Sequence, residues 1–117
     1  MTGFETFRRP APESDRPEIT VGDGDTLRLN EASIRALRTP HAVELQFDPE
    51  VPAIALRSVH PDQSPDAFDV DFLPEGGARV NAEEFLRHYG LAFSEPRRLP
   101  AYMDKGVLRV DVGEVAR

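Results

Sequence analysis

Alternation of apolar and polar residues along the chain predicts short β-strands. Ile19 and Val21 alternate with polar neighbours, residues 22–25 are all Gly or Asp, and the alternation resumes at Leu27 and Leu29. Alternation with a period of two on both sides of a Gly/Asp cluster is typical of a β-hairpin. We therefore expect the ordered part of the chain to begin with two antiparallel strands.

The hydrophobic period then changes to that of a short helix. Asn30 is a favourable N-cap, Ile34 and Leu37 mark one apolar stripe, and Pro40 ends the helix. A second alternating hairpin follows over residues 43–56. The first half of the chain therefore predicts the order β-β-α-β-β.

The second half predicts the same order. A hairpin is expected over residues 68–80, and a helix capped by Asn81 follows it. A Pro- and Arg-rich stretch, residues 94–100, is interpreted as a loop that leads to a last hairpin ending at Val112. Eight short strands and two short helices are expected in total, which is a mainly β fold.

A short motif suggests that the two halves are copies of one unit. Arg28-Leu29-Asn30 recurs 51 positions later as Arg79-Val80-Asn81. A fixed internal period indicates a repeated structural unit. We expect two repeats, residues 17–60 and 66–112, which share one hydrophobic core because each is small for folding alone.

The repeats are expected to form a single barrel domain, residues 17–117, preceded by a flexible N-terminal arm. The arm, residues 1–16, contains two prolines with mixed charges and no hydrophobic period. With its two repeats, the chain is expected to be a monomeric pseudo-dimer or to form a homodimer.

The repeated order of elements and the motif before each helix resemble the AbrB/MazE-like swapped-hairpin family, the SpoVT/AbrB type. In that family two such units exchange hairpins to build one barrel. The resemblance covers about residues 17–112, and it implies a tandem fusion of two units with a pseudo-two-fold axis. It also implies a DNA-binding transcription regulator without enzymatic activity. Antitoxin-like relatives imply an alternative, an acidic protein-interaction module without DNA binding.

The family usually carries a pair of arginines in the helix. Arg35 matches one position of this pair, and a constant offset of 51 places Phe85 and Leu86 at the pair in the second repeat. The candidate residues for contact with double-stranded DNA are the arginines of the two units: Arg28, Arg35, Arg38, Arg79 and Arg87. The alternative is that they are solvated or paired with acidic neighbours.

Net charge limits the role of these arginines. The chain carries −7, spread over both repeats, and no segment is a basic block. General attraction to nucleic acid or to anionic lipid is therefore not supported, whereas a local basic patch remains possible.

Contact with a protein partner has its own candidates. Phe4 and Phe7 lie three apart in the arm, and Arg97 and Arg98 are adjacent in the Pro-rich loop. An acidic surface or an exposed sheet edge would serve the same purpose.

Catalysis, cofactors and metals have little support in the sequence. No nucleophile elbow or nucleotide-binding Gly motif is present, so no catalytic residue and no cofactor is expected. The three histidines lack zinc-site spacing, and the aspartates between Asp62 and Asp71 are interpreted as a solvated strand face, so no metal is expected. A small-ligand or enzymatic barrel is the remaining alternative.

Cellular location is inferred from two absences. Cysteine is absent, which fits a reducing cytoplasm. The sequence contains no apolar run of membrane-spanning length, so no membrane association is expected.

Overall fold

The computed structural model describes Gly3 and residues 15–115. The described part contains nine strands, two α-helices and one 3-10 helix. The strands are β1 (Glu18–Asp23), β2 (Thr26–Leu29), β3 (Ala42–Asp48), β4 (Ala53–Val59), β5 (Phe68–Asp69), β6 (Asp71–Phe72), β7 (Ala78–Asn81), β8 (Arg97–Asp104) and β9 (Val107–Asp111). The helices are α1 (Glu31–Ala36), α2 (Glu83–His88) and the 3-10 helix η1 (Pro61–Gln63).

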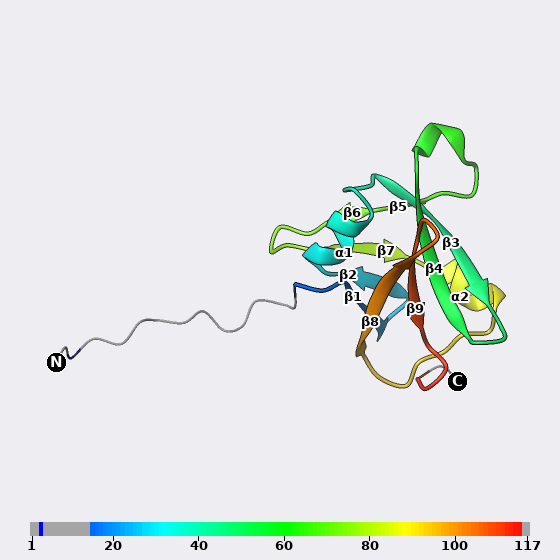
Figure 1. Ribbon diagram of the computed structural model, residues 1–117. Helices are drawn as coiled ribbons and strands as arrows, with labels where there is room; N and C mark the ends of the chain where they lie inside the picture. The colour runs from blue at the N-terminus through cyan, green and yellow to red at the C-terminus, as the bar shows by residue number, and fades with distance from the viewer. Residues whose placement is uncertain (1–2, 4–14, 116–117) are drawn as a thin grey trace.

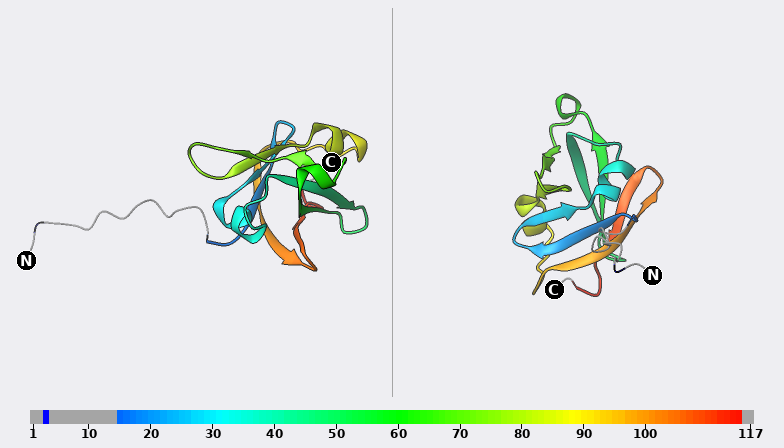
Figure 2. Two further views of the ribbon diagram at one scale, coloured as in Figure 1. Left: turned by 90° about the horizontal axis from the view of Figure 1, so that it is seen from above. Right: turned by 90° about the vertical axis from the view of Figure 1, so that its left-hand side faces the viewer.

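All nine strands belong to one antiparallel sheet with the order β5-β3-β4-β9-β8-β1-β2-β7-β6. The two end strands, β5 and β6, are separated in the sequence only by Val70. The sheet therefore curls around until its ends meet and forms a nearly closed barrel (Figures 1 and 2). The prediction of a mainly β fold with two short helices is confirmed.

The barrel interior is filled by apolar side chains from both halves of the chain. Ile19, Leu27, Ile54, Leu56 and Leu108 are completely buried. Their neighbours along each strand face outward because successive side chains of a strand point to opposite faces of the sheet. No helix in the described part is long and apolar enough to cross a bilayer.

Two predicted strands have different bounds. The segment 68–72 is divided at Val70, because its first part pairs with β3 and its second part pairs with β7. The predicted loop over residues 94–100 is wrong in its second half, since Arg97 and Arg98 belong to β8 and pair with β1. Pro100 is tolerated there because its missing N–H would point away from β1, where pairing with β9 begins only at the next residue.

The two helices begin differently. Asn30 is the predicted N-cap of α1, and its Oδ1 accepts a hydrogen bond of 2.9 Å from the Ser33 N–H. The prediction that Asn81 is the N-cap of α2 is wrong, because the N-cap is Ala82 and makes no side-chain cap. The Ala82 N–H donates to the Asp25 carbonyl at 2.8 Å, which holds the backbone extended for one residue more.

Residues 1–2 and 4–14 lie outside the described residues, and so do the candidates Phe4 and Phe7. Attachment to the barrel begins one residue before the predicted domain boundary. The Arg16 carbonyl accepts a hydrogen bond of 2.9 Å from Asn30 Nδ2.

Candidate functional site

A row of directly opposite residues crosses the outer face of the barrel. From strand to strand the row runs Arg98 on β8, Thr20 on β1, Arg28 on β2, Arg79 on β7 and Asp71 on β6. Opposite residues share one face of a sheet, and the apolar residues flanking this row along β1, β2 and β7 are buried, so the row faces outward. We call its three basic members, Arg98, Arg28 and Arg79, the arginine row. Neighbouring strands lie about 4.8 Å apart, so the row spans about 14 Å.

The centre of the arginine row is a like-charged pair. Arg28 lies directly opposite Arg79, and like charges in this position destabilise a sheet. Arg28 Nη2 lies 3.4 Å from Glu75 Oε1, but both side chains are about half exposed or more, so this ion pair is weak. Arg79 has no ion pair or side-chain hydrogen bond with any other described residue. Positive charge at the centre is therefore only partly compensated, by Glu75 near Arg28 and by Asp71 opposite Arg79.

A hollow of about 300 Å³ opens beside Arg28. Arg28 and Arg98 lie on its walls, together with Gly76 and Gly77 from the turn between β6 and β7. Glu18 also lines the hollow, and its carboxylate lies 3.9 Å from Arg98 Nε. The hollow thus combines two guanidinium groups with backbone that carries no side chain.

The other candidate arginines lie beyond the two ends of β2 and β7. These strands are antiparallel, α1 follows β2 and α2 follows β7, so the helices lie at opposite ends of the strand pair (Figure 1). Arg35 and Arg38 therefore lie at one end and Arg87 at the other. Of the predicted set, the structure brings only Arg28 and Arg79 into direct opposition.

The helix bounds change one equivalence between the halves. Arg35 is the fifth residue of six-residue α1, and Arg87 is the fifth residue of six-residue α2. Arg87 therefore corresponds to Arg35, whereas a constant offset of 51 assigns Leu86 to that position, because the second half has one extra residue before its helix. Arg87 Nη2 is 3.0 Å from Glu83 Oε1, one turn earlier.

Arg98 belongs to the arginine row although the sequence predicts a different role for it. The two prolines that flank it favour a loop residue for contact with a protein partner. The pattern of apolar and polar residues around Arg98 does not indicate a strand there. The strand forms by pairing with β1, which lies far away in the sequence. Arg97, its neighbour, is exposed and lies 3.8 Å from Glu95.

A second surface feature is a groove between α2 and the segment before β6. Two adjoining hollows of about 840 and 500 Å³ share Ala67, Phe68, Glu84 and His88. We call the two together the α2 groove. Its carboxylates are Asp66, Asp69, Asp71, Glu83 and Glu84. Among the described residues, no three of the His, Asp and Glu side chains are grouped so that they could hold a metal ion.

Aromatic rings line one end of the α2 groove. The Tyr89 ring centroid lies 4.8 Å from that of Phe47 on β3 and 5.1 Å from that of Phe85 on α2. Phe85 is buried, whereas Tyr89 is about half exposed. The groove therefore has an apolar end beside β3 and an acidic remainder.

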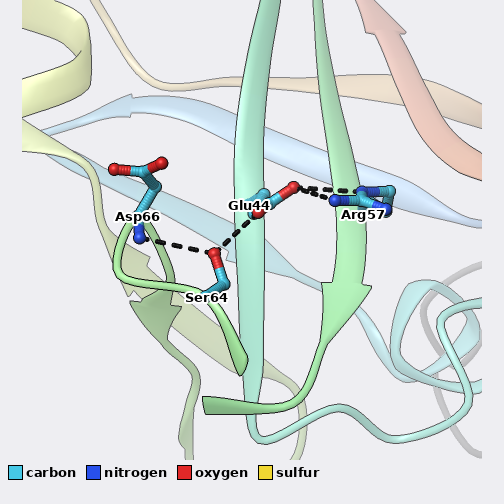
Figure 3. A network of polar contacts seen from close by, with 4 residues as sticks. All are labelled: Glu44, Arg57, Ser64 and Asp66. Atoms are coloured by element: carbon cyan, nitrogen blue, oxygen red, sulfur yellow. Dashed lines mark hydrogen bonds and ion pairs between the residues drawn. The ribbon is translucent and has the colours of Figure 1, made fainter. Parts of the chain in front are cut away.

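A polar network fixes the segment that borders the α2 groove (Figure 3). Ser64 Oγ donates to Glu44 Oε2 at 2.6 Å and accepts from the Asp66 N–H at 3.3 Å. Arg57 donates to Glu44 Oε1 through both Nε and Nη2. Glu44 and Arg57 are cross-strand neighbours on β3 and β4, so the network attaches the segment that contains Ser64 and Asp66 to the sheet.

The pKa of Glu44 lies below its ordinary value. The main cause is the hydrogen bond from the Ser64 hydroxyl, and the hydrogen bonds from the Arg57 guanidinium are the second cause. A carboxylate with a lowered pKa stabilises the fold above its unfolded-state pKa and loses that effect as the pH falls through the folded-state value. We expect Glu44→Gln to lower the melting temperature near pH 7 and to have a smaller effect near pH 3.

Thermal melts followed by circular dichroism at both pH values would test this expectation. Glu50→Gln is the matched control, because Glu50 is exposed on the turn after β3 and its side chain makes no ion pair with a described residue. A loss that is the same for Glu44→Gln at both pH values would contradict the assignment of the network to the ionised carboxylate.

Comparison with known proteins found no relative of this chain. No protein-family model matches the chain, no curated protein matches its sequence, and no solved structure matches its fold. The function is therefore inferred from the geometry of the chain itself.

Proposed function

We propose that this chain is a non-enzymatic DNA-binding module of a regulatory kind, which contacts duplex phosphates through the arginine row. The observation that carries the proposal is the direct opposition of Arg28 and Arg79 on the outer face of β2 and β7. Such a pair lowers the stability of the sheet when no anion is bound. A phosphate between the two guanidinium groups would turn this repulsion into two charge-assisted hydrogen bonds.

The charge of the rest of the molecule supports a contact limited to this face. The net charge is −7, so most of the surface repels nucleic acid. The arginine row places three guanidinium groups within about 14 Å across three strand spacings. A regulator of this kind would act in the cytoplasm.

We further propose that the barrel is a tandem fusion of two swapped-hairpin units of the AbrB/MazE-like type. The strand pairing supports this. β2 pairs with its counterpart β7, and β4 pairs with its counterpart β9. The pairing of β1 with β8 in turn corresponds to the pairing of β5 with β3. Two hydrogen bonds between the halves support it as well. The Gly77 N–H donates to Glu31 Oε1 at 2.6 Å, and the Ala82 N–H donates to the Asp25 carbonyl at 2.8 Å.

A two-fold arrangement would suit a duplex. The axis would pass between Arg28 and Arg79, with Arg35 and Arg87 at equal positions on the two sides. Two-fold symmetric proteins match the two-fold symmetry of the DNA backbone. The helix arginines would then contact phosphates farther from the centre.

Binding to a mixed-sequence DNA duplex at increasing salt tests the DNA proposal. We expect affinity to fall steeply with salt, because each phosphate contact releases counterions. The double variant Arg28→Gln/Arg79→Gln is expected to lower the slope of log affinity against log salt by about 2, close to 1 for each lost contact. Fluorescence anisotropy of a labelled duplex measures both quantities.

Arg109→Gln is the matched control. Arg109 lies on β9, outside the arginine row, and is held by Asp104 at 3.7 Å and Asp111 at 3.4 Å. Its replacement changes the net charge but removes no proposed phosphate contact, so the slope should stay near that of the parent chain. Absence of duplex binding at low salt, or equal slopes for the control and the double variant, would refute the proposal.

A further inference from the structure

The outer edge of β3 is only half covered. The Val70 N–H donates to the His41 carbonyl at 3.0 Å, so the backbone groups of His41 point towards β5. Backbone groups alternate in direction along a strand, so those of Val43, Leu45 and Phe47 point the same way. Pairing with β5 ends at Val43. Leu45 and Phe47 therefore present their N–H and C=O groups to this side without a backbone partner among the described residues.

The corresponding edge of β8 is filled by the chain itself. There the Ala101 N–H donates to the Pro17 carbonyl at 3.0 Å, just beyond the last β1–β8 pair. Extended backbone thus lies beside Ala101 on β8. The equivalent position beside Leu45 on β3 is open. The barrel geometry accommodates an added segment at this kind of edge.

The free edge opens into the α2 groove. Leu45 lines the smaller hollow, of about 500 Å³, together with Phe85 and Tyr89 from α2. A segment paired with β3 would therefore place alternate side chains against aromatic rings. Phe47, the second residue with free backbone groups, already packs on Tyr89. Backbone pairing and an apolar contact are thus available at one place.

The charge of the groove indicates the chemistry of the partner. Five carboxylates line it, and the opposing charge comes from Arg87, which is already paired with Glu83. A segment carrying arginine or lysine would be attracted, whereas an acidic segment or a nucleic-acid backbone would be repelled. This surface therefore differs in sign from the arginine row.

We propose that the α2 groove binds an extended, basic peptide segment of a partner protein, which adds to the free edge of β3 as a short strand. Main-chain hydrogen bonds to Leu45 and Phe47 would provide affinity, as in other cases of strand addition. The groove carboxylates would select basic side chains, and Phe85 and Tyr89 would receive an apolar one. The proposal does not depend on DNA binding, because no member of the arginine row lines the groove, although Asp71 of the groove lies directly opposite Arg79.

A short labelled peptide with arginines at alternate positions around a central phenylalanine is the probe. We expect it to bind the full chain in a fluorescence anisotropy titration. The same peptide, N-methylated on the residues that donate to β3, is expected to bind about tenfold more weakly, since it loses backbone hydrogen bonds. Replacement of its arginines by glutamates should abolish binding.

Two variants of the protein test whether the peptide binds at the free edge of β3 and in the α2 groove. Leu45→Pro removes a backbone N–H that faces the open edge, and proline is tolerated on edge strands, so β3 and β4 should stay paired while peptide affinity falls about tenfold. Glu84→Gln changes an exposed carboxylate on α2 and should also weaken binding. Glu114→Gln is its control, because Glu114 is exposed and lines neither hollow.

Three outcomes would overturn the proposal. The first is no binding of the arginine peptide up to about 1 mM, which corresponds to about −4 kcal/mol. The second is equal binding of the N-methylated and unmodified peptides, which would reduce the contact to general charge attraction. The third concerns the chain's own residues 1–14, which carry Phe7, Arg8 and Arg9. A large gain in peptide affinity on their removal would identify them as the occupant in place of a partner protein.

Discussion

Replacing Gly22 with alanine is expected to lower the free energy of unfolding by about 2–5 kcal/mol. Gly22 has a φ of +84°, which is costly for a residue with a Cβ. The added Cβ would also lie 2.2 Å from the Glu95 carbonyl oxygen and 3.1 Å from Phe93 Cβ. Because the closest atom is backbone, the segment before β8 would have to move away from the β1–β2 hairpin.

Gly24→Ala provides the matched control for this prediction. Gly24 lies two residues later, in the turn between β1 and β2, with a φ of +64°, but a Cβ added there would meet no atom within 4 Å. Only the cost of the backbone conformation applies, so we expect a loss of about 1–2 kcal/mol. Urea denaturation of both variants measures the difference. Equal losses would show that the close approach to Glu95 is relieved without cost.

Replacing Asn30 with alanine is expected to cost about 2–4 kcal/mol. The buried side chain accepts from the Ser33 N–H at 2.9 Å and from the Glu18 N–H at 3.0 Å, and it donates to the Arg16 carbonyl at 2.9 Å. Alanine would remove the helix cap and leave polar backbone groups without partners. The start of β1 would lose its attachment to α1 at the same time.

Asn81→Ala is the control that the second half of the chain offers. Asn81 is exposed, and its Oδ1 accepts one hydrogen bond of 3.2 Å from the Glu83 N–H. We expect a loss of about 0.5–1 kcal/mol for this variant. Chemical denaturation of the two variants compares the same residue type at the end of each copy of the motif. A cost for Asn81→Ala equal to that of Asn30→Ala would contradict the role given to burial.

The sequence predicts those parts of the fold that depend on local chemistry. The hairpin at 22–25 and the N-cap of α1 follow from Gly, Asp and Asn, whose preferences act within a few residues. The loop prediction for Arg97 and Arg98 is wrong because their strand is defined by β1, which is distant in the sequence. Local composition there favours a loop, and pairing with the available edge overrides it.

The same reason limits prediction of the candidate sites. The repeated motif points to Arg28 and Arg79, and the register of β2 with β7 places them opposite each other. Arg98 joins them only through the pairing of β8 with β1, which no local pattern contains. The free edge at Leu45 is likewise a property of where β5 ends, and alternation along β3 continues past that point without a change.

The pairing between distant strands has a consequence for how the molecule is made. β1, β2, β3 and β4 each hydrogen-bond to a strand from the second half of the sequence. A nascent chain that has left the ribosome only as far as β4 therefore lacks most of the surfaces that bury its apolar side chains. Folding must wait until β9 has been translated, and shorter nascent chains expose unpaired strand edges that chaperones and proteases recognise.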